Sequence, residues 1–425
     1  MQRVPPEIIS LIIEKTRNPF FAGFLPWDTY YALSACSLVC KSWTPLAQAY
    51  LFENLHITAD KGLDRFLAFL ENTPHVAVAV RSLSIRPGLF HVRLEDVADL
   101  DESPKPASPA LFPTLLMNIL SNLPALSSLY LERMTLLGWP RDTPLPTVPV
   151  RLRVLTLFVL TYKLSSTPDL MPVDFLTFFE LDELRLLDCT CDISLDAHFS
   201  DVHVLPVATQ PVAKKLDISG HDELLRFSIE RGCGGVDPKH VESVVLCPGD
   251  MITLVWMGTL LRLYRPYVRH ICLSMTSLLA EGQLDASLYP DLQSFACNMS
   301  ECSELESLHF IWEHYHPSVY GPEDQQDAAL SDAYAVVLSS APKTLRELRL
   351  STLSPSTVET LAGTLRRIAP LIVQTTRMFS HLLEITLVVR HTFAHWLQQC
   401  MDVLRPLLPA KIVDSGVIRL ECVFP

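Results

Sequence analysis

The sequence predicts a short, all-helical N-terminal segment followed by an α/β repeat in which strands and helices alternate. Three observations lead to this fold class. The first fifty residues contain three short apolar segments of helical type. From residue 52 onward a strand-like apolar pattern recurs twelve times, and amphipathic helical segments lie between its copies. The chain has 425 residues, of which 49% are hydrophobic and 19% charged, so it has ample apolar material for a large core.

The N-terminal segment predicts three helices. Residues 5–7, Pro-Pro-Glu, suit a helix start, because proline tolerates the first turn and a glutamate complements the positive end of the helix. Residues 18–19, Asn-Pro, end this helix; a second begins near Asp28, and a third covers residues 43–51. Helices this short and this apolar cannot bury all their surface within one another, which predicts an interface with a partner protein.

The strand pattern is apolar, two variable residues, apolar, one variable residue, apolar. Such alternation predicts a strand with one buried face. The copies are centred at Leu55, Leu83, Leu129, Leu155, Leu184, Leu216, Val244, Ile271, Leu308, Leu348, Ile385 and Leu420. Their mean spacing is about 33 residues, which is typical of solenoids whose units bury their faces against neighbours. Helices are predicted between them at residues 63–70, 111–123, 251–264, 291–302, 327–339, 358–368 and 393–404.

Four strings in the N-terminal segment resemble an F-box of the fungal type. They are Val-Pro-Pro-Glu-Ile-Ile at residues 4–9, Leu-Ser-Ala-Cys-Ser-Leu-Val-Cys-Lys-Ser-Trp at 33–43, Leu-Ala at 46–47 and Leu-Phe at 51–52. The resemblance implies docking on the Skp-family adaptor of an SCF-type cullin-RING ubiquitin ligase. The residues assigned to the adaptor-binding surface are Val4, Pro5, Ile8, Leu33, Cys36, Val39, Cys40, Trp43 and Leu46. Val4 stands where the family usually has leucine.

The repeating units resemble leucine-rich repeats, which often follow an F-box. Consensus repeats carry Asn or Cys three residues after the last strand leucine, and Cys189 is the clear example here. The units are therefore expected to be irregular. The fold class predicted is α+β or α/β repeat: a three-helix F-box over residues 1–52, then an irregular leucine-rich-repeat-like solenoid of about 12 strand units over residues 53–425.

Charge and composition exclude several classes. The net charge is −13 and no basic patch is apparent, which argues against a nucleic-acid partner. No run reaches the 18 or more apolar residues of a membrane span, and the first residues do not resemble a signal peptide. The 11 cysteines form no even framework, which predicts free thiols in the cytoplasm, the nucleus or both.

The sequence contains no pattern typical of a catalytic, metal or cofactor site. No nucleophile elbow, Walker A loop, zinc-protease helix or paired CxxC motif is present. We therefore expect no catalytic residues, no cofactor and no metal, and a chain that is not an enzyme.

The function expected is that of a substrate-recognition subunit, in which the F-box docks the adaptor and the solenoid binds a protein client. The alternative is a non-ligase binding scaffold of leucine-rich-repeat type with a degenerate F-box. Residues flanking the buried strand positions point to the open face of the sheet. The client-binding candidates on that face are Tyr130, Glu132, Arg185, Asp217, His270, His309 and Arg349, with Thr386 beside them.

Overall fold

The computed structural model describes residues 7–9, 11–12, 26–39, 41, 43–59, 62–88, 108–137, 148–163, 175–192, 211–220, 236–280, 289–313, 323–353, 358–379, 381–390 and 395–423. The chain divides into two compact units. Unit 1 comprises residues 1–181 and 190–209, and unit 2 comprises residues 182–189 and 210–425.

A twelve-stranded sheet is the main feature of the fold, and its strands follow one another in chain order. They are β1 (Asn54–Thr58), β2 (Ser82–Arg86), β4 (Ser128–Glu132), β6 (Val150–Phe158), β8 (Phe179–Leu187), β10 (Val212–Gly220), β11 (Ser243–Pro248), β12 (His270–Ser274), β13 (Ser307–Glu313), β14 (Glu347–Leu353), β15 (Glu384–Arg390) and β16 (Ile418–Val423). Pairing is parallel from β1 to β6 and from β10 to β16. Each of the twelve positions where the sequence pattern is centred lies in one of these strands.

Alternation along each strand builds the core. In β14, Leu348 and Leu350 are buried while Glu347 and Arg349 are partly exposed on the other face. Leu348 is in register with Leu308 of β13 and Ile385 of β15, so the buried residues form rows that run across the strands. A shift of one residue would turn every one of them to the solvent, which is why the apolar pattern fixes the register.

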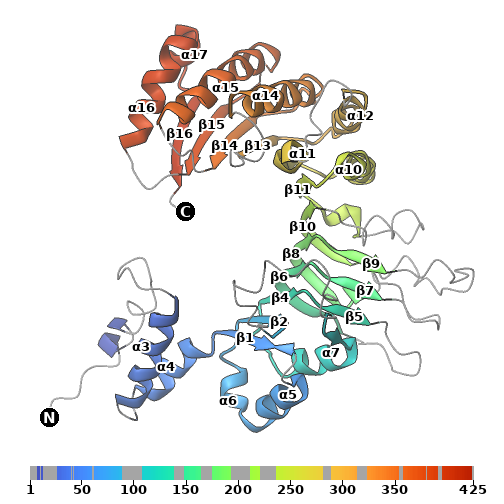
Figure 1. The fold of residues 1–425 in the computed structure, drawn as a ribbon, viewed down its shortest axis with the longest axis vertical. Helices are drawn as coiled ribbons and strands as arrows, with labels where there is room; N and C mark the ends of the chain where they lie inside the picture. Colours follow the sequence, from blue (N-terminus) through green and yellow to red (C-terminus); the bar gives the residue numbers. More distant parts are fainter. Residues whose placement is uncertain are drawn as a thin grey trace, which may run out of the picture. The chain divides into compact units, whose positions relative to one another are not determined.

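Helices cover one face of the strands in unit 2 (Figure 1). They are α10 (Met251–Tyr264), α11 (Thr276–Ala280), α12 (Tyr289–Ser300), α14 (Glu323–Ser339), α15 (Val358–Met378), α16 (His395–Leu404) and α17 (Ala410–Asp414), with the 3₁₀ turns η5 (Pro238–His240) and η7 (Arg405–Leu407). The α10 helix begins at Asp250, whose carboxylate accepts hydrogen bonds from the backbone N–H of Thr253 (2.7 Å) and from its hydroxyl (2.6 Å).

The α15 helix is longer than the sequence predicts. We expected it to end at residue 368, ahead of Pro370, but it continues to Met378. Proline removes one backbone hydrogen bond from a helix interior. Leu371 and Ile372 are buried directly after it, so packing of this apolar face holds the helix together across the proline.

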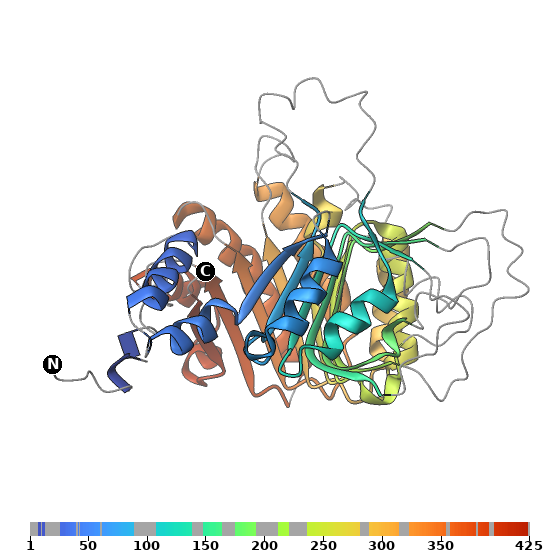
Figure 2. The ribbon, with the colours of Figure 1, turned by 90° about the horizontal axis from the view of Figure 1, so that it is seen from below.

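Unit 1 contains the helices of the first half of the chain. They are α3 (Pro26–Val39), α4 (Thr44–Leu51), α5 (Leu63–Asn72), α6 (Pro74–Ala77) and α7 (Pro113–Ser121). The α5 and α7 helices pack side by side, as both views show (Figures 1 and 2). A second, four-stranded parallel sheet has the order β3 (Ala110–Leu111), β5 (Thr135–Leu137), β7 (Thr161–Lys163), β9 (Thr190–Asp192).

A recurring corner connects the two sheets. After β4, β6 and β8 the chain passes through a residue with positive φ, namely Arg133, Val159 and Asp188 respectively. The next residue is buried and apolar in each case, and a short strand of the second sheet follows. The corners stack, because the N–H of Thr161 donates to the carbonyl of Met134 (2.9 Å). Short strands thus follow three of the long strands, in a stretch for which the sequence predicted no helix.

The predicted fold class is wrong. The structure is an α/β arrangement built on a twelve-stranded parallel sheet, instead of a three-helix F-box followed by an irregular leucine-rich-repeat-like solenoid. In the N-terminal region the described residues form two helices, α3 and α4, with helical fragments at residues 7–9 and 11–12. In the middle of the chain the short strands β5, β7 and β9 of the second sheet, which the sequence did not predict, follow β4, β6 and β8. The predicted domain boundary at residue 52 stays a prediction.

Gly220 provides a test of these corners. Its φ is +74°, and a Cβ at this position would overlap the carboxylate of Asp188. Gly220→Ala is therefore expected to destabilise the chain by more than about 2 kcal/mol, from left-handed backbone strain plus this overlap. Gly416 is the matched control, because its φ is +71° with nothing within 4 Å of the added methyl. Chemical denaturation of both variants measures the difference; equal losses would show that the overlap with Asp188 costs nothing.

Candidate functional site

The open face of unit 2 is the side of the sheet that points away from the helices. It carries Glu183, Arg185, Lys215, Asp217, Cys272, His309, Arg349, Ser351, Glu384, Thr386, Arg419 and Glu421. One row runs in register from β10 to β16, through Asp217, Val245, Cys272, His309, Arg349, Thr386 and Arg419. The parallel sheet thus brings together residues that are up to 202 positions apart in the sequence.

The first polar cluster on this face is formed by β8 and β10. Glu183 accepts from Arg185 (2.9 Å) and pairs with Lys215 (2.8 Å). Burial raises the pKa of Glu183, but the hydrogen bonds and charges of these two cations outweigh it, so its pKa is lowered overall. Asp217 differs, because burial raises its pKa more than Arg185 and Lys215 lower it. The charge of Glu183 is thus balanced by the two cations that it contacts, whereas the carboxylate of Asp217 is partly desolvated.

Asp217 makes the stability of this unit depend on pH. Its folded-state pKa lies above the ordinary value of 3.8, so its ionised form opposes folding at neutral pH and protonation stabilises the fold as the pH falls through the folded pKa. Asp217→Asn is therefore expected to be more stable than the parent at pH 7, with a difference that shrinks as the pH approaches 4. Urea denaturation at several pH values measures this. A variant that is less stable at pH 7 would show that Asp217 is a net stabilising ion-pair partner.

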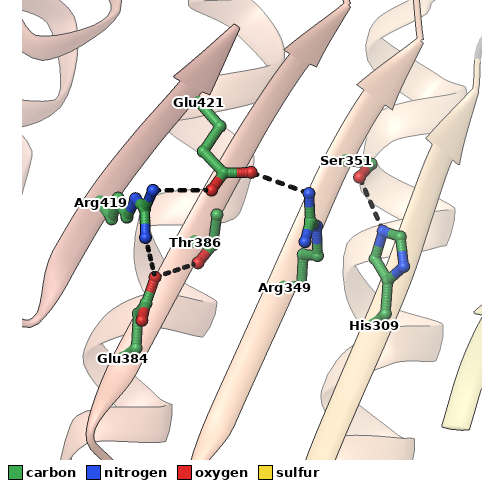
Figure 3. Close-up of polar contacts among 7 residues, drawn as sticks. All are labelled: His309, Arg349, Ser351, Glu384, Thr386, Arg419 and Glu421. Atoms are coloured by element: carbon green, nitrogen blue, oxygen red, sulfur yellow. Dashed lines mark hydrogen bonds and ion pairs between the residues drawn. The ribbon is translucent and has the colours of Figure 1, made fainter. Parts of the chain in front are cut away.

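The second polar cluster lies across β14, β15 and β16 (Figure 3). Arg349 donates to Glu421 (2.8 Å), and Glu421 also pairs with Arg419 (3.3 Å). Glu384 accepts from Thr386 (2.7 Å) and lies 3.7 Å from Arg419. These side chains are partly exposed, so each pair contributes little to stability on its own. Arg and Glu nevertheless alternate in a connected array, and Thr386 is buried beneath it.

Next to this array, His309 of β13 faces Ser351 of β14. The Nε2 atom of His309 lies 2.6 Å from the hydroxyl oxygen of Ser351, which is buried (Figure 3). A buried hydroxyl needs a hydrogen-bond partner, and the imidazole supplies it. This contact fixes the orientation of the ring on the open face.

Tyr130 and Glu132 lie on β4 in unit 1, where both contact Arg86 of β2. Arg86 pairs with Glu132 (3.1 Å), and its guanidinium lies 5.2 Å from the centre of the Tyr130 ring. Burial, followed by the charge of Glu132, raises the pKa of Tyr130. This is a compact polar group with its own cation–π contact.

The structure gathers most of the predicted client-binding residues of unit 2. Asp217, His309 and Arg349 share one row, Arg185 is close enough to Asp217 for its charge to lower the pKa of that carboxyl, and His270 is exposed at the start of β12. Sequence reasoning missed Glu183, Lys215, Cys272, Ser351, Glu384, Arg419 and Glu421. The same alternation, extended by two residues along each strand, would have found them.

The residues assigned to the adaptor-binding surface fall into three groups. Leu33, Cys36, Trp43 and Leu46 pack with Ile9 and Ala47 in one small apolar cluster, in which Leu33 is 4% exposed. Ile8 and Val39 are exposed, at 49% and 61%. Val4, Pro5 and Cys40 lie outside the described residues.

Three further apolar side chains of this region are exposed and were not assigned. Leu38 is 83% exposed, Leu11 is 50% exposed and Ile12 is 43% exposed. With Ile8 and Val39 they make five exposed aliphatic side chains on short helical segments. We call these five residues the N-terminal apolar patch. Large exposed apolar side chains such as these are typical of a protein interface.

Comparison with protein-family models and with curated proteins finds no match for this chain. Among the described residues, no helix has the length and apolar character needed to cross a bilayer. In the same part of the chain, no three His, Cys, Asp or Glu side chains are grouped in a way that could hold a metal ion.

Proposed function

We propose that this chain is a substrate-recognition subunit of an SCF-type cullin-RING ubiquitin ligase, acting in the cytoplasm or the nucleus. Residues 4–52, which resemble an F-box, would dock a Skp-family adaptor. The open face of the sheet would hold a protein client, so that ubiquitin transfer takes place at high effective concentration. The chain supplies binding and no chemistry.

The observation that carries this proposal is the N-terminal apolar patch. Leu38 and Val39 are the most exposed of its residues, and Val39 begins the Val-Cys-Lys-Ser-Trp string at residues 39–43, the most specific part of the resemblance. Ile9, Leu33 and Ala47 are buried in one small cluster, whereas the side chains of the N-terminal apolar patch are exposed. In this proposal the adaptor covers them.

The open face supports the client half of the proposal. Its charges alternate in sign, with Arg349 and Arg419 beside Glu384 and Glu421. A surface of this kind suits a protein with charges of both signs, since like charges placed against it are costly and opposite charges fix the register. An arginine in such a row can bind a carboxylate through two parallel hydrogen bonds.

Co-expression tests the proposal directly. The tagged full-length chain is produced together with an untagged Skp-family adaptor and purified through the tag. The expected result is a stable complex with one adaptor per chain. Purification of the chain without adaptor, in a folded state, would contradict the ligase assignment and favour a scaffold that binds clients alone.

A further inference from the structure

Cys272 of β12 and His309 of β13 occupy neighbouring positions of the same open-face row. The Sγ atom of Cys272 lies 3.3 Å from Nδ1 of His309, and Nε2 of that ring lies 2.6 Å from Oγ of Ser351. Three side chains from three adjacent strands thus form a continuous chain of hydrogen-bonding groups.

This geometry sets the chemistry of the thiol. In the tautomer that carries its proton on Nε2, the ring donates to the buried Ser351 hydroxyl, and Nδ1 presents its lone pair to Cys272, from which it can accept the thiol proton. The product is a thiolate beside an imidazolium, which is the arrangement that activates a cysteine toward electrophiles. Cys272 is partly exposed, so a small reagent can reach it.

We infer that Cys272 is a reactive thiol, activated by His309 and oriented through Ser351, and a site of reversible oxidation by peroxides on the open face of the sheet. In the step proposed, the thiolate attacks one peroxide oxygen and the O–O bond breaks. A sulfenic acid forms on Cys272, and the departing hydroxide takes the imidazolium proton and leaves as water. Sulfur supplies the two electrons, and a thiol reductant restores the starting state.

The consequence concerns the open face itself. A sulfenic acid, or a disulfide formed from it, would add bulk and polarity in the row that also contains Asp217 and Arg349. Oxidation would therefore alter client binding through that face. This consequence rests on the proposed function, whereas the reactivity of Cys272 does not.

Other cysteines of the same chain provide internal controls. Cys297 is exposed, whereas Cys302 and Cys400 are buried. Burial raises the pKa of Cys302 to about 12, so it serves as the inert reference. An ordinary exposed thiol is only a few per cent ionised at neutral pH. If accessibility alone sets the alkylation rates, Cys297 will react faster than Cys272. If the imidazole of His309 activates the thiol, Cys272 will react faster than Cys297.

The experiment is site-resolved alkylation of the native full-length chain with iodoacetamide at pH 7, followed by mass spectrometry. We expect Cys272 to react about tenfold faster than Cys297, because the imidazole 3.3 Å from its sulfur can take the thiol proton, and the gain is offset in part by the lower intrinsic nucleophilicity of such a thiolate. A dimedone probe after brief exposure to hydrogen peroxide should label Cys272 first. A Cys272 rate at or below that of Cys297 in the parent chain would overturn the inference.

Two variants separate activation from exposure. His309→Asn should slow alkylation of Cys272 by at least about fivefold and leave Cys297 unchanged, since the proton acceptor is lost. Ser351→Ala should give a smaller loss, because the ring keeps its acceptor but loses its orienting partner. An unchanged Cys272 rate in folded His309→Asn would contradict the role of the imidazole. Adaptor co-purification is a separate readout, so failure of either proposal can be recognised independently.

Discussion

A chain carrying Leu38→Asp and Val39→Asp is expected to lose the Skp-family adaptor during co-purification while it keeps its fold. Both side chains are largely exposed in the isolated chain, at 83% and 61%, so the substitutions remove little internal packing. In the complex each would place a carboxylate in an apolar interface. Loss of one well-packed anchor costs about 2 kcal/mol or more, roughly 30-fold in affinity. The double variant should fall below detection in a pull-down and in a titration by calorimetry.

Leu383→Asp is the matched control for this variant. Leu383 is 71% exposed in unit 2, so the same change of chemistry is made at an exposed leucine outside residues 4–52. It should retain the adaptor fully. Retention of the adaptor by the double variant as well would remove the N-terminal apolar patch from the interface.

Trp43→Ala is a less selective test than the sequence alone suggests. Trp43 packs against the cluster of Ile9, Leu33 and Ala47, and it directly precedes α4. Its truncation would loosen α4 in addition to any interface. Substitutions at Leu38 and Val39 separate adaptor docking from local folding.

Phe310→Ala is expected to be the most destabilising single truncation in the core of unit 2. Phe310 is fully buried on β13, and its ring stacks on that of Tyr334 in α14 with centroids 4.3 Å apart. Truncation of a buried phenylalanine costs about 3 to 5 kcal/mol, because transfer free energy is lost and a cavity remains. Tyr334 would also lose the ring that holds it against the sheet. Chemical denaturation followed by tryptophan fluorescence should show a clear drop in the midpoint.

Phe112→Ala controls for the change of residue type, since Phe112 is 52% exposed, and it should change the stability by less than about 1 kcal/mol. Tyr334→Phe dissects the same contact further. The Tyr334 hydroxyl donates to the carbonyl of Ile311 (2.6 Å), so its removal from a buried position should cost about 1 to 3 kcal/mol. A Phe310→Ala variant as stable as Phe112→Ala would show that the stacked pair contributes nothing to the folded state.

The strands were the most predictable part of the fold. Their two-residue period is a local signal, and Leu348 and Leu350 show it without reference to any other part of the chain. The helices α10 and α12 lie at or near their predicted bounds, because the pattern that predicts a helix is also local in the sequence. The second sheet was not predictable, because β5 and β7 are each only three residues long and depend on the positive φ at Arg133 and Val159.

The candidate site was predictable in part. Alternation placed Asp217, His309 and Arg349 on the open face, but no pattern in the sequence says that they lie in one row, since this depends on the register of successive strands. Arg349 and Glu421 are 72 positions apart and are paired only by the fold. The connected array of charges and the contact of Cys272 with His309 likewise depend on the fold and could not be predicted from the sequence.

By itself, the sequence determined where the strands lie, which of their apolar side chains face the core, and the absence of common catalytic motifs, because these follow from local periodicity and residue chemistry. Only the tertiary structure decided the fold class, the second sheet and the grouping of Glu183, Lys215, Cys272, Arg419 and Glu421 with the predicted residues. The physical reason is that a parallel sheet joins residues through hydrogen bonds between distant strands. Their register is set by the packing of all the strands together, not by any one segment.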